Sequence, residues 1–350
     1  MYYVNEDIKN CVRVFPEQGR YDYARYDMNE NPEGLPKEFV DEVLKEITPE
    51  FLSTYPEHDK FRKMYADYIG VKPENIAVTN GSDMGIRFIM EVFAEKGSSV
   101  VTVAPSFEMY WVNCSMLGLK HVPVSYEPDL TMDVNKIVAA IDETTDIVVL
   151  LNPNNPIGTV YTEEEARRVI ERAREVGAVV IVDEAYHYFY RHTFLPLIQE
   201  YENVVVLRTF SKLFSLAAVR MGMIIADEKL IEYARKSMPS FEVNAVALKF
   251  GEHLMQHTEL IENLMNAEAE GKTYLLEELA KHGYETVPSH GNFIFILPKK
   301  PAKEVSQALR ERKILIKTFG NEFLKKYVRI STGSKKAMKY FLDAFLEADN

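Results

Sequence analysis

The sequence predicts an α/β protein with a large domain, built on a mostly parallel seven-stranded sheet covered by helices, and a smaller C-terminal α+β domain. Three observations support this fold class. The 350 residues are too many for one small core. Seven short β-branched segments recur, several of them separated by helical patterns. Their nearly continuous apolar character is expected of strands that are buried on both faces.

The predicted strands of the large sheet are 75–79, 99–103, 121–125, 146–151, 178–182, 204–207 and 221–226. The clearest predicted helices between them are 82–96, 107–118 and 163–176. In open α/β sheets, ligands bind outside the carboxyl ends of the strands. Polar residues that directly follow a predicted strand are therefore the first candidates for a functional site.

The composition changes after about residue 240. A long amphipathic segment, 244–281, ends at His282-Gly283. Strands at 293–297 and 328–331 then alternate with helices at 304–313 and 336–346. We therefore expect an N-terminal arm (1–30), a large ligand-binding domain (31–240) and a small C-terminal domain (241–350).

The charge and the cysteine content limit the partners and the cellular location that this protein is expected to have. The net charge of −12, from 41 basic and 53 acidic residues, argues against a nucleic-acid partner. Cys11 and Cys114 show no metal or redox spacing. The N-terminus does not read as a signal peptide, and no apolar run approaches the ~18–20 residues of a membrane helix. We expect a cytoplasmic protein without a membrane partner.

Lys212 is the candidate covalent anchor for a carbonyl cofactor. It follows the predicted strand 204–207 on a turn, where partial burial would help its amine to lose a proton. An amine, an acid, an amide, a phenol and a guanidinium all follow strand ends in this chain. These groups are the ones needed to hold pyridoxal phosphate. The alternative for Lys212 alone is a solvated loop lysine.

Asp183 closes the apolar run 179–182 and is the candidate partner of a protonated pyridine nitrogen. Tyr186, three residues later, and Asn155 are candidates to donate hydrogen bonds to the ring oxygen. The alternatives are a helix cap for Asp183 and turn chemistry for Asn155, which lies in Asn-Pro-Asn-Asn-Pro.

The phosphate of such a cofactor needs hydrogen-bond donors. Ser82 and Asp83 open a predicted helix, whose free N–H groups favour anions, although Asp83 alone also suits an N-cap. Thr209, Ser211 and Arg220 supply hydroxyls and a guanidinium. An ordinary ion pair is the alternative for Arg220.

Two further residues are candidates for the cofactor ring and the substrate. Phe107 has the right type to stack on the ring, although a core aromatic is the simpler interpretation. Arg329 lies inside a short apolar strand and requires an anionic partner, for which a substrate carboxylate would serve. His253 and His257 have i, i+4 spacing, but no further ligand is apparent in the sequence, so we predict no metal site.

Nine motifs, taken in order, resemble those of fold-type I pyridoxal-phosphate aminotransferases of class I/II, and most of all the histidinol-phosphate aminotransferase branch. They are residues 29–34, 54–57, 79–83, 105–110, 152–158, 183–186, 209–212, 220–222 and 328–331.

The resemblance implies the fold of type I pyridoxal-phosphate transferases and a role for each matching residue. Lys212 carries the cofactor, Asp183 pairs with the ring nitrogen, and Asn155 and Tyr186 hold the ring oxygen. The phosphate is bound by Ser82, Asp83, Thr209, Ser211 and Arg220. Tyr55 reaches the cofactor of a neighbouring subunit, which implies a homodimer, and Arg329 takes the α-carboxylate of the amino donor.

Two departures from the branch concern the substrate. Lys317 stands where the branch commonly has an arginine that helps to bind the substrate phosphate, and Ala218 stands where glycine is usual. Lysine contacts phosphate as a point charge, without the bidentate fork of arginine. Lys317, Tyr23 and Tyr110 are the candidates to shape the variable part of the substrate site.

These features predict a transaminase that moves an amino group from an amino acid, glutamate in the first instance, to a phosphorylated or carboxylated carbonyl acceptor. In that reaction Lys212 acts as the general base. The nearest alternative is a decarboxylase of a phosphorylated amino acid that uses the same cofactor. A third is a ligand-binding regulatory protein on this fold, which the complete catalytic set disfavours.

Overall fold

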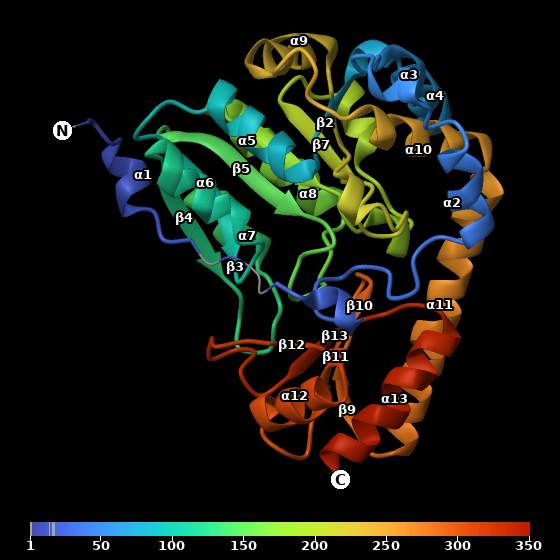
Figure 1. Cartoon of the computed structure of the whole chain (residues 1–350). Coiled ribbons are helices and arrows are strands. Elements are labelled where there is room, and N and C mark those ends of the chain that lie inside the picture. The colour runs from blue at the N-terminus through green and yellow to red at the C-terminus, as the bar shows by residue number, and fades with distance from the viewer. Residues whose placement is uncertain (1, 14, 16–17) are drawn as a thin grey trace.

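The computed structural model describes residues 2–13, 15 and 18–350, which form a large upper lobe and a smaller lower lobe (Figure 1). The predicted arm, 1–30, includes Met1, Val14, Pro16 and Glu17, which lie outside the described residues. In the rest of this segment, helix α1 (Glu6–Asn10) contacts α6 (Met109–Leu117) of the large lobe. Strand β1 (Ala24–Arg25) pairs in parallel with β11 (Ile314–Leu315), which joins the N-terminal segment to the C-terminal part of the chain.

The predicted seven-stranded sheet is confirmed, in the strand order β2-β8-β7-β6-β5-β3-β4. Strands β4, β3, β5, β6 and β7 run parallel, and β8 is antiparallel to both β7 and β2. The strands are β2 (Ile76–Thr79), β3 (Ser99–Ala104), β4 (Lys120–Ser125), β5 (Thr145–Leu151), β6 (Val179–Asp183), β7 (Val204–Thr209) and β8 (Gly222–Ala226).

Successive residues of the central strands enter two separate apolar cores, one on each face of the sheet. Val180 of β6 belongs to one core, and its neighbour Ile181 belongs to the other. The second core contains residues of α5 (Ser82–Phe93), α6 and α9 (Glu228–Ser237), and the first contains residues of α7 (Val134–Ala140) and α8 (Glu163–Glu175). Burial on both faces explains why these strands are apolar throughout.

The smaller lobe contains a four-stranded antiparallel sheet with the order β12-β13-β10-β9. Its strands are β9 (Glu285–Val287), β10 (Phe293–Leu297), β12 (Lys317–Thr318) and β13 (Val328–Ser331). Helices α12 (Ala302–Glu311) and α13 (Lys335–Asp349) lie close to the predicted ranges 304–313 and 336–346. Together they bury a third apolar core.

The predicted amphipathic segment 244–281 is divided at His257 into α10 (Ala245–Gln256) and α11 (Thr258–Lys281). Helix α10 packs against α4 (Asp59–Ile69), whereas α11 packs against α13. Near the start of α11, Ile261 still belongs to the core of the large lobe, whereas Leu275 and Leu279 belong to the core of the smaller lobe, so the chain passes between the lobes along α11. Helices α2 (Lys37–Leu44) and α3 (Pro49–Leu52) complete the region before the first strand of the large sheet. Within the described ranges, no helix is long and apolar enough to cross a membrane.

Candidate active site

The predicted site residues lie at the ends of strands of the large sheet. Asp183 is the last residue of β6, and Asn155 and Lys212 follow β5 and β7. Ser82 and Asp83 lie in the first turn of α5, which is separated from the end of β2 by two residues, and Arg220 lies two residues before β8. Because β5, β6 and β7 are parallel, their carboxyl ends meet at one edge of the sheet.

Asp183 is a buried anion at this edge, with 2% of its surface exposed. Its Oδ2 accepts a hydrogen bond from the Tyr110 hydroxyl at 2.7 Å, and Oδ1 accepts one from the Ala185 amide at 3.0 Å. Burial raises the pKa of the Asp183 carboxyl to about 6, although the two hydrogen bonds act to lower it. No cation among the described residues forms an ion pair with Asp183. A buried carboxylate of this kind favours a cationic ligand.

Lys212 is held near Tyr186. Its Nζ donates a hydrogen bond to the Met28 carbonyl oxygen at 3.0 Å and lies 5.8 Å from the centre of the Tyr186 ring. The Tyr186 hydroxyl accepts a hydrogen bond from Asn29 Nδ2 at 2.9 Å. Lys212 also lines a cavity of about 80 Å³, together with Glu268, Asn292 and Thr332 of the C-terminal part of the chain. The amine therefore faces a space between the two lobes.

Arg220 and the start of α5 form a cradle for an anion. Arg220 Nη2 donates to Asp83 Oδ2 at 3.2 Å, and Nη1 donates to Ser211 Oγ at 3.3 Å. The Ser211 amide in turn donates to Thr209 Oγ1 at 3.1 Å. Gly81 has a φ of +82°, and a Cβ placed on it would lie 2.4 Å from Arg220 Nη2. Only glycine allows this approach, which sets the guanidinium beside the N-terminus of a 12-residue helix.

Arg329 is a buried cation on β13, with 5% of its surface exposed. It donates to Asn155 Oδ1 at 2.7 Å and to the Asp27 carbonyl oxygen at 2.9 Å. Burial lowers its pKa to about 10. Its Nε has no hydrogen-bond partner, and no carboxylate of the described chain pairs with it. The guanidinium therefore has capacity for an anionic ligand.

The residues present fit the predicted cofactor. The buried Asp183 suits a cationic ring nitrogen, the Arg220 cradle suits a phosphate, and Lys212 directly follows Ser211 of that cradle. Asn29 Oδ1 and Asn292 Oδ1 are also buried without partners, and the Asn292 side chain bonds the Asn29 carbonyl at 3.0 Å. Such unsatisfied polar atoms indicate a site that is completed by a ligand.

The remaining candidates occupy different positions. Phe107 is half-buried and meets the edge of the Tyr110 ring, with 6.4 Å between ring centres. Lys317 is exposed on β12, directly opposite Arg329 in the β12–β13 ladder. Tyr55 lies at the surface, 73% exposed, and stacks on Phe241 at 4.3 Å rather than joining the buried residues.

Sequence reasoning missed several contacts of the site. Tyr110 was a candidate for the substrate pocket, but it is fully buried and bonds Asp183 instead. Asn29 and Asn292 were not singled out, although Asn29 bonds the Tyr186 hydroxyl and Asn292 bonds the Asn29 carbonyl oxygen. The φ of +56° at Asn29 agrees with the tolerance of asparagine for this conformation, but such a tendency does not identify a site residue. Tyr23 lies against Arg310 and Lys313.

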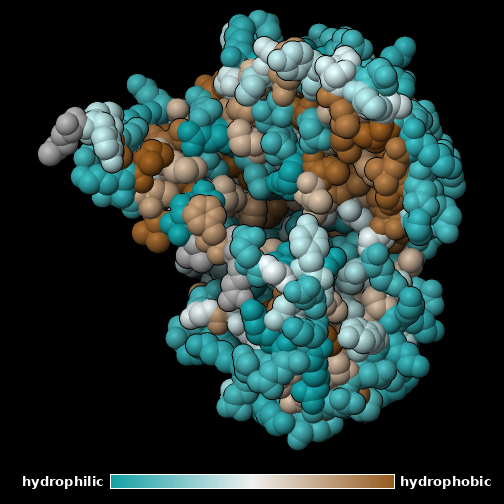
Figure 2. Space-filling view, in the orientation of Figure 1, coloured by the Kyte–Doolittle hydropathy of each residue, from teal (hydrophilic) through white to brown (hydrophobic). Residues whose placement is uncertain are grey.

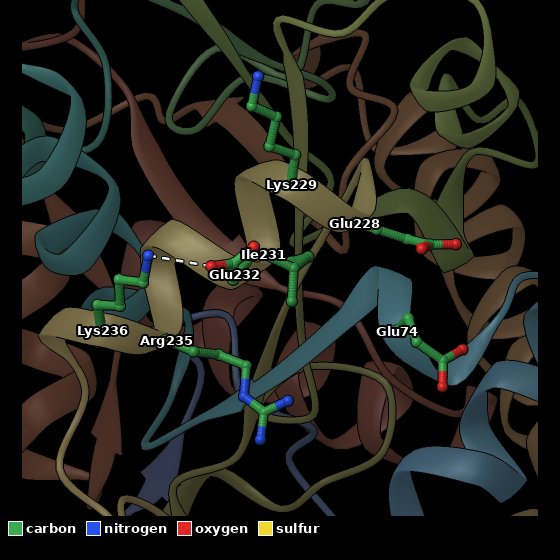
Figure 3. A pocket seen from close by; sticks show the side chains of 7 residues that line it. All are labelled: Glu74, Glu228, Lys229, Ile231, Glu232, Arg235 and Lys236. Atoms are coloured by element: carbon green, nitrogen blue, oxygen red, sulfur yellow. Dashed lines mark ion pairs between the residues drawn. The ribbon is translucent and has the colours of Figure 1, made fainter.

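A larger surface hollow of about 590 Å³ lies on α9, away from these residues (Figure 3). Its lining residues are Glu74, Glu228, Lys229, Ile231, Glu232, Arg235 and Lys236. Lys236 pairs with Glu232 at 3.0 Å, and Glu228 pairs with Lys72 at 2.7 Å. The charges at this hollow are mostly exposed and mutually compensated, so it offers less chemistry than the smaller cavity beside Lys212.

Comparison with known proteins gives consistent matches over nearly the whole chain. The model of the family "Aminotransferase class I and II" matches residues 25–345. A histidinol-phosphate aminotransferase from Clostridium novyi is 34% identical over 335 residues, covering 95% of this chain and 93% of that protein. One from Caldanaerobacter subterraneus is 34% identical over 349 residues, covering 98% of both. The structure of histidinol-phosphate aminotransferase from Sinorhizobium meliloti, in complex with pyridoxal-5'-phosphate, has a TM-score of 0.87 and 23% identity, and the match covers 99% of this chain and 98% of that one.

Proposed function

Because the chain belongs to the aminotransferase class I and II family, we propose specific roles for its residues and a substrate for the reaction. The protein is a pyridoxal 5'-phosphate-dependent transaminase that acts on small molecules. The observation that carries the residue assignment is that a buried carboxylate without a cationic partner, Asp183, and a lysine amine, Lys212, both lie at the carboxyl ends of neighbouring parallel strands.

The cofactor is held by residues from both sides of this edge. Asp183 would accept a hydrogen bond from the ring nitrogen and hold its proton, and the Tyr110 hydroxyl, which donates to Asp183 Oδ2, would orient the carboxylate. Tyr186 and Asn155 would donate to the ring oxygen, and Phe107 would supply an aromatic face for the ring. The phosphate is bound by the helix N-terminus and hydroxyls around Arg220. These residues are Ser82, Asp83, Thr209, Ser211 and Arg220.

The Lys212 amine carries the cofactor at rest and then moves a proton at the α-carbon of the amino donor. The cofactor, when bound, supplies an electron sink for the negative charge that develops at that carbon. Partial burial and the Met28 carbonyl at 3.0 Å hold the amine at one position, which favours proton transfer in a defined direction. Arg329 binds the α-carboxylate of the donor. Its unpartnered Nε and its contact with Asn155 support this role.

For the substrates we propose that glutamate is the amino donor. The acceptor is the keto compound that corresponds to histidinol phosphate, so histidinol phosphate itself is the donor in the reverse direction. The names of the relatives support this choice. The position of Lys317 opposite Arg329 supports it too, because a second cation beside the carboxylate site suits a substrate phosphate.

A decarboxylase of a phosphorylated amino acid is less supported, because the curated relatives are transaminases.

We also propose a homodimer in which Tyr55 reaches the cofactor phosphate of the partner subunit. Exposed apolar side chains at Leu52, Tyr55 and Phe241 support an interface. Figure 2 shows hydrophobic side chains gathered on the upper lobe beside the hollow between the lobes. A cytoplasmic location is proposed from the free thiols of Cys11 and Cys114, and cell fractionation would test it.

The decisive experiment is a visible absorption spectrum of the purified protein with pyridoxal phosphate, titrated with glutamate and, in a second sample, with histidinol phosphate. Both donors should convert the lysine-bound cofactor to its amine form. Conversion by glutamate alone would keep the transaminase and reject the phosphorylated substrate. The variant Lys212→Ala should show no lysine-bound absorption and lose roughly 10²- to 10⁴-fold or more in turnover. Unchanged turnover in that variant would overturn the assignment of Lys212.

A further inference from the structure

A compact group of histidine and glutamate side chains lies where α10 meets α2. His253 is in the last turn of α10, His257 directly follows that helix, and Glu42 is in the last turn of α2. His253 Nδ1 lies 3.6 Å from Glu42 Oε1, and His257 Nε2 lies 3.5 Å from the same oxygen. All three atoms lie within 4.8 Å of one another. None of these residues lines the cavity beside Lys212.

The second ring nitrogen of each histidine is directed at a different carboxylate. His253 Nε2 donates to Glu46 Oε1 at 2.8 Å, and His257 Nδ1 donates to Glu259 Oε1 at 3.2 Å. A carboxylate that accepts the N–H of one ring nitrogen leaves the lone pair on the other. In both rings that other nitrogen faces Glu42. Paired carboxylates of this kind orient the histidine ligands of metal sites.

His253 is the member of the group that has a buried ring nitrogen without a hydrogen-bond partner. It is 4% exposed, and its Nδ1 is buried with no hydrogen-bond partner among the described residues. The 3.6 Å to Glu42 is longer than a hydrogen bond. A buried ring nitrogen without a partner requires an explanation, because such atoms are normally satisfied. A cation located between His253, His257 and Glu42 would bind the lone pair of this nitrogen.

We propose that Glu42, His253 and His257 bind a divalent transition-metal ion of the Zn²⁺ type. Imidazole nitrogen and carboxylate oxygen are ligands that Zn²⁺ takes at ~2.0–2.2 Å, which sets neighbouring ligands of a tetrahedral ion roughly 3.3–3.5 Å apart. The two nitrogen–oxygen separations, 3.5 and 3.6 Å, are close to that spacing. Water completes the fourth position. Glu42 and His253 lie in the last turns of α2 and α10, where the helix dipole favours a cation.

The charged neighbours of the group agree with this assignment. Lys249 Nζ bonds Glu46 Oε2 at 3.0 Å and lies 3.5 Å from Glu252 Oε2, and Glu252 also pairs with Lys60 at 2.5 Å. Glu46 and Glu252 are therefore neutralised by lysines, whereas Glu42 has no lysine or arginine partner among the described residues. The Phe39 ring meets both imidazoles edge-on, at 6.4 and 6.0 Å, and forms an apolar wall. The ion would join α2 to the junction of α10 and α11.

The test is metal binding by the full-length holoenzyme. The protein is treated with a chelator, transferred to phosphate-free buffer and titrated with ZnCl₂ by calorimetry, and bound zinc is counted after gel filtration. We expect one zinc per chain and a rise in the unfolding temperature with zinc. His257→Ala and Glu42→Gln, both at partly exposed positions, should lose this binding. Glu259→Ala, which removes only the outer carboxylate, should weaken it by ~10- to 100-fold.

The matched control is His282→Ala, which removes an exposed histidine at the end of α11 and should bind zinc as the wild type does. Cofactor absorption in every variant verifies that the chain is folded. Absence of stoichiometric zinc in the wild type would show that the group is a network of side chains without a metal ion, and it would overturn the proposal. Binding of equal strength in the wild type and His257→Ala would locate the zinc elsewhere and overturn it as well.

Discussion

Lys317 and Arg329 are direct cross-strand neighbours in the β12–β13 ladder, with Arg329 buried and Lys317 exposed. Residues directly opposite each other in an antiparallel pair project from the same face of the sheet. The two cations therefore lie on the same face of the sheet, with Arg329 in the interior and Lys317 at the surface. We assign Arg329 to a substrate carboxylate and Lys317 to the phosphorylated end of the alternative substrate.

Replacing Lys317 should affect only the phosphorylated substrate. Lys317→Ala is expected to raise KM for histidinol phosphate roughly fivefold, because one exposed charge pair is worth up to about 1 kcal/mol. The KM for glutamate should not change. Lys317→Arg should lower KM for histidinol phosphate, since arginine binds phosphate with a bidentate fork. Steady-state kinetics with both donors measure this. Lys325→Ala, at an exposed lysine paired with Glu322, is the control; an equal effect there would contradict the assignment.

Replacing Arg329 should weaken binding of the amino donor. Arg329→Lys keeps the charge but removes the fork, with an expected loss of about 1.5–3 kcal/mol, or roughly 10- to 150-fold in kcat/KM for glutamate. The loss should appear mainly in KM, and cofactor absorption should remain. An unchanged KM for glutamate would assign the donor carboxylate to another residue.

Asp183 predicts a pH dependence of stability in the cofactor-free protein. Its pKa rises from 3.8 in the unfolded chain to about 6 in the fold, because burial disfavours the carboxylate. The folded state then binds more protons than the unfolded state between these values, so Asp183 lowers the free energy of unfolding as pH rises from about 4 to about 6. The full effect is about 3 kcal/mol.

The isosteric variant Asp183→Asn removes this titration. Urea unfolding of the cofactor-free proteins should show the variant gaining stability relative to the wild type as pH rises through that window. With the cofactor bound, the wild type should instead be the more stable of the two proteins above pH 6, because the ring nitrogen then supplies the cation that Asp183 lacks. A difference that does not depend on pH in the cofactor-free proteins would refute this account.

Gly81 predicts a specific loss of cofactor binding. Gly81→Ala introduces a Cβ 2.4 Å from Arg220 Nη2 at a φ of +82°, so the guanidinium must move away from the phosphate position. The control is Gly97→Ala, at a φ of +94° with open space around it. Both variants should lose about 1 kcal/mol of stability through backbone strain. Only Gly81→Ala should also weaken pyridoxal phosphate, measured by fluorescence titration, by an expected tenfold or more.

Local sequence was sufficient for the large sheet. The runs at 178–182 and 204–207 are apolar at every position, and that pattern follows directly from burial on both faces, as the separate cores around Val180 and Ile181 show. The placement of Asp183 and Lys212 at strand ends followed from the same boundaries. The break at His257 was not apparent, because apolar spacing continues on both sides of it.

The sequence by itself therefore determined the fold class and which residue types end each strand, because hydrophobic periodicity is a local property of the chain. Only the tertiary structure decided which of them meet. Tyr110 and Asp183 are 73 positions apart, Asn29 and Tyr186 are 157 apart, and Glu42 approaches His253 and His257 from another helix. The sequence showed two histidines without a third ligand. The packing of α2 on α10 supplied it, because contacts between distant segments depend on the geometry of the whole fold and leave no local pattern.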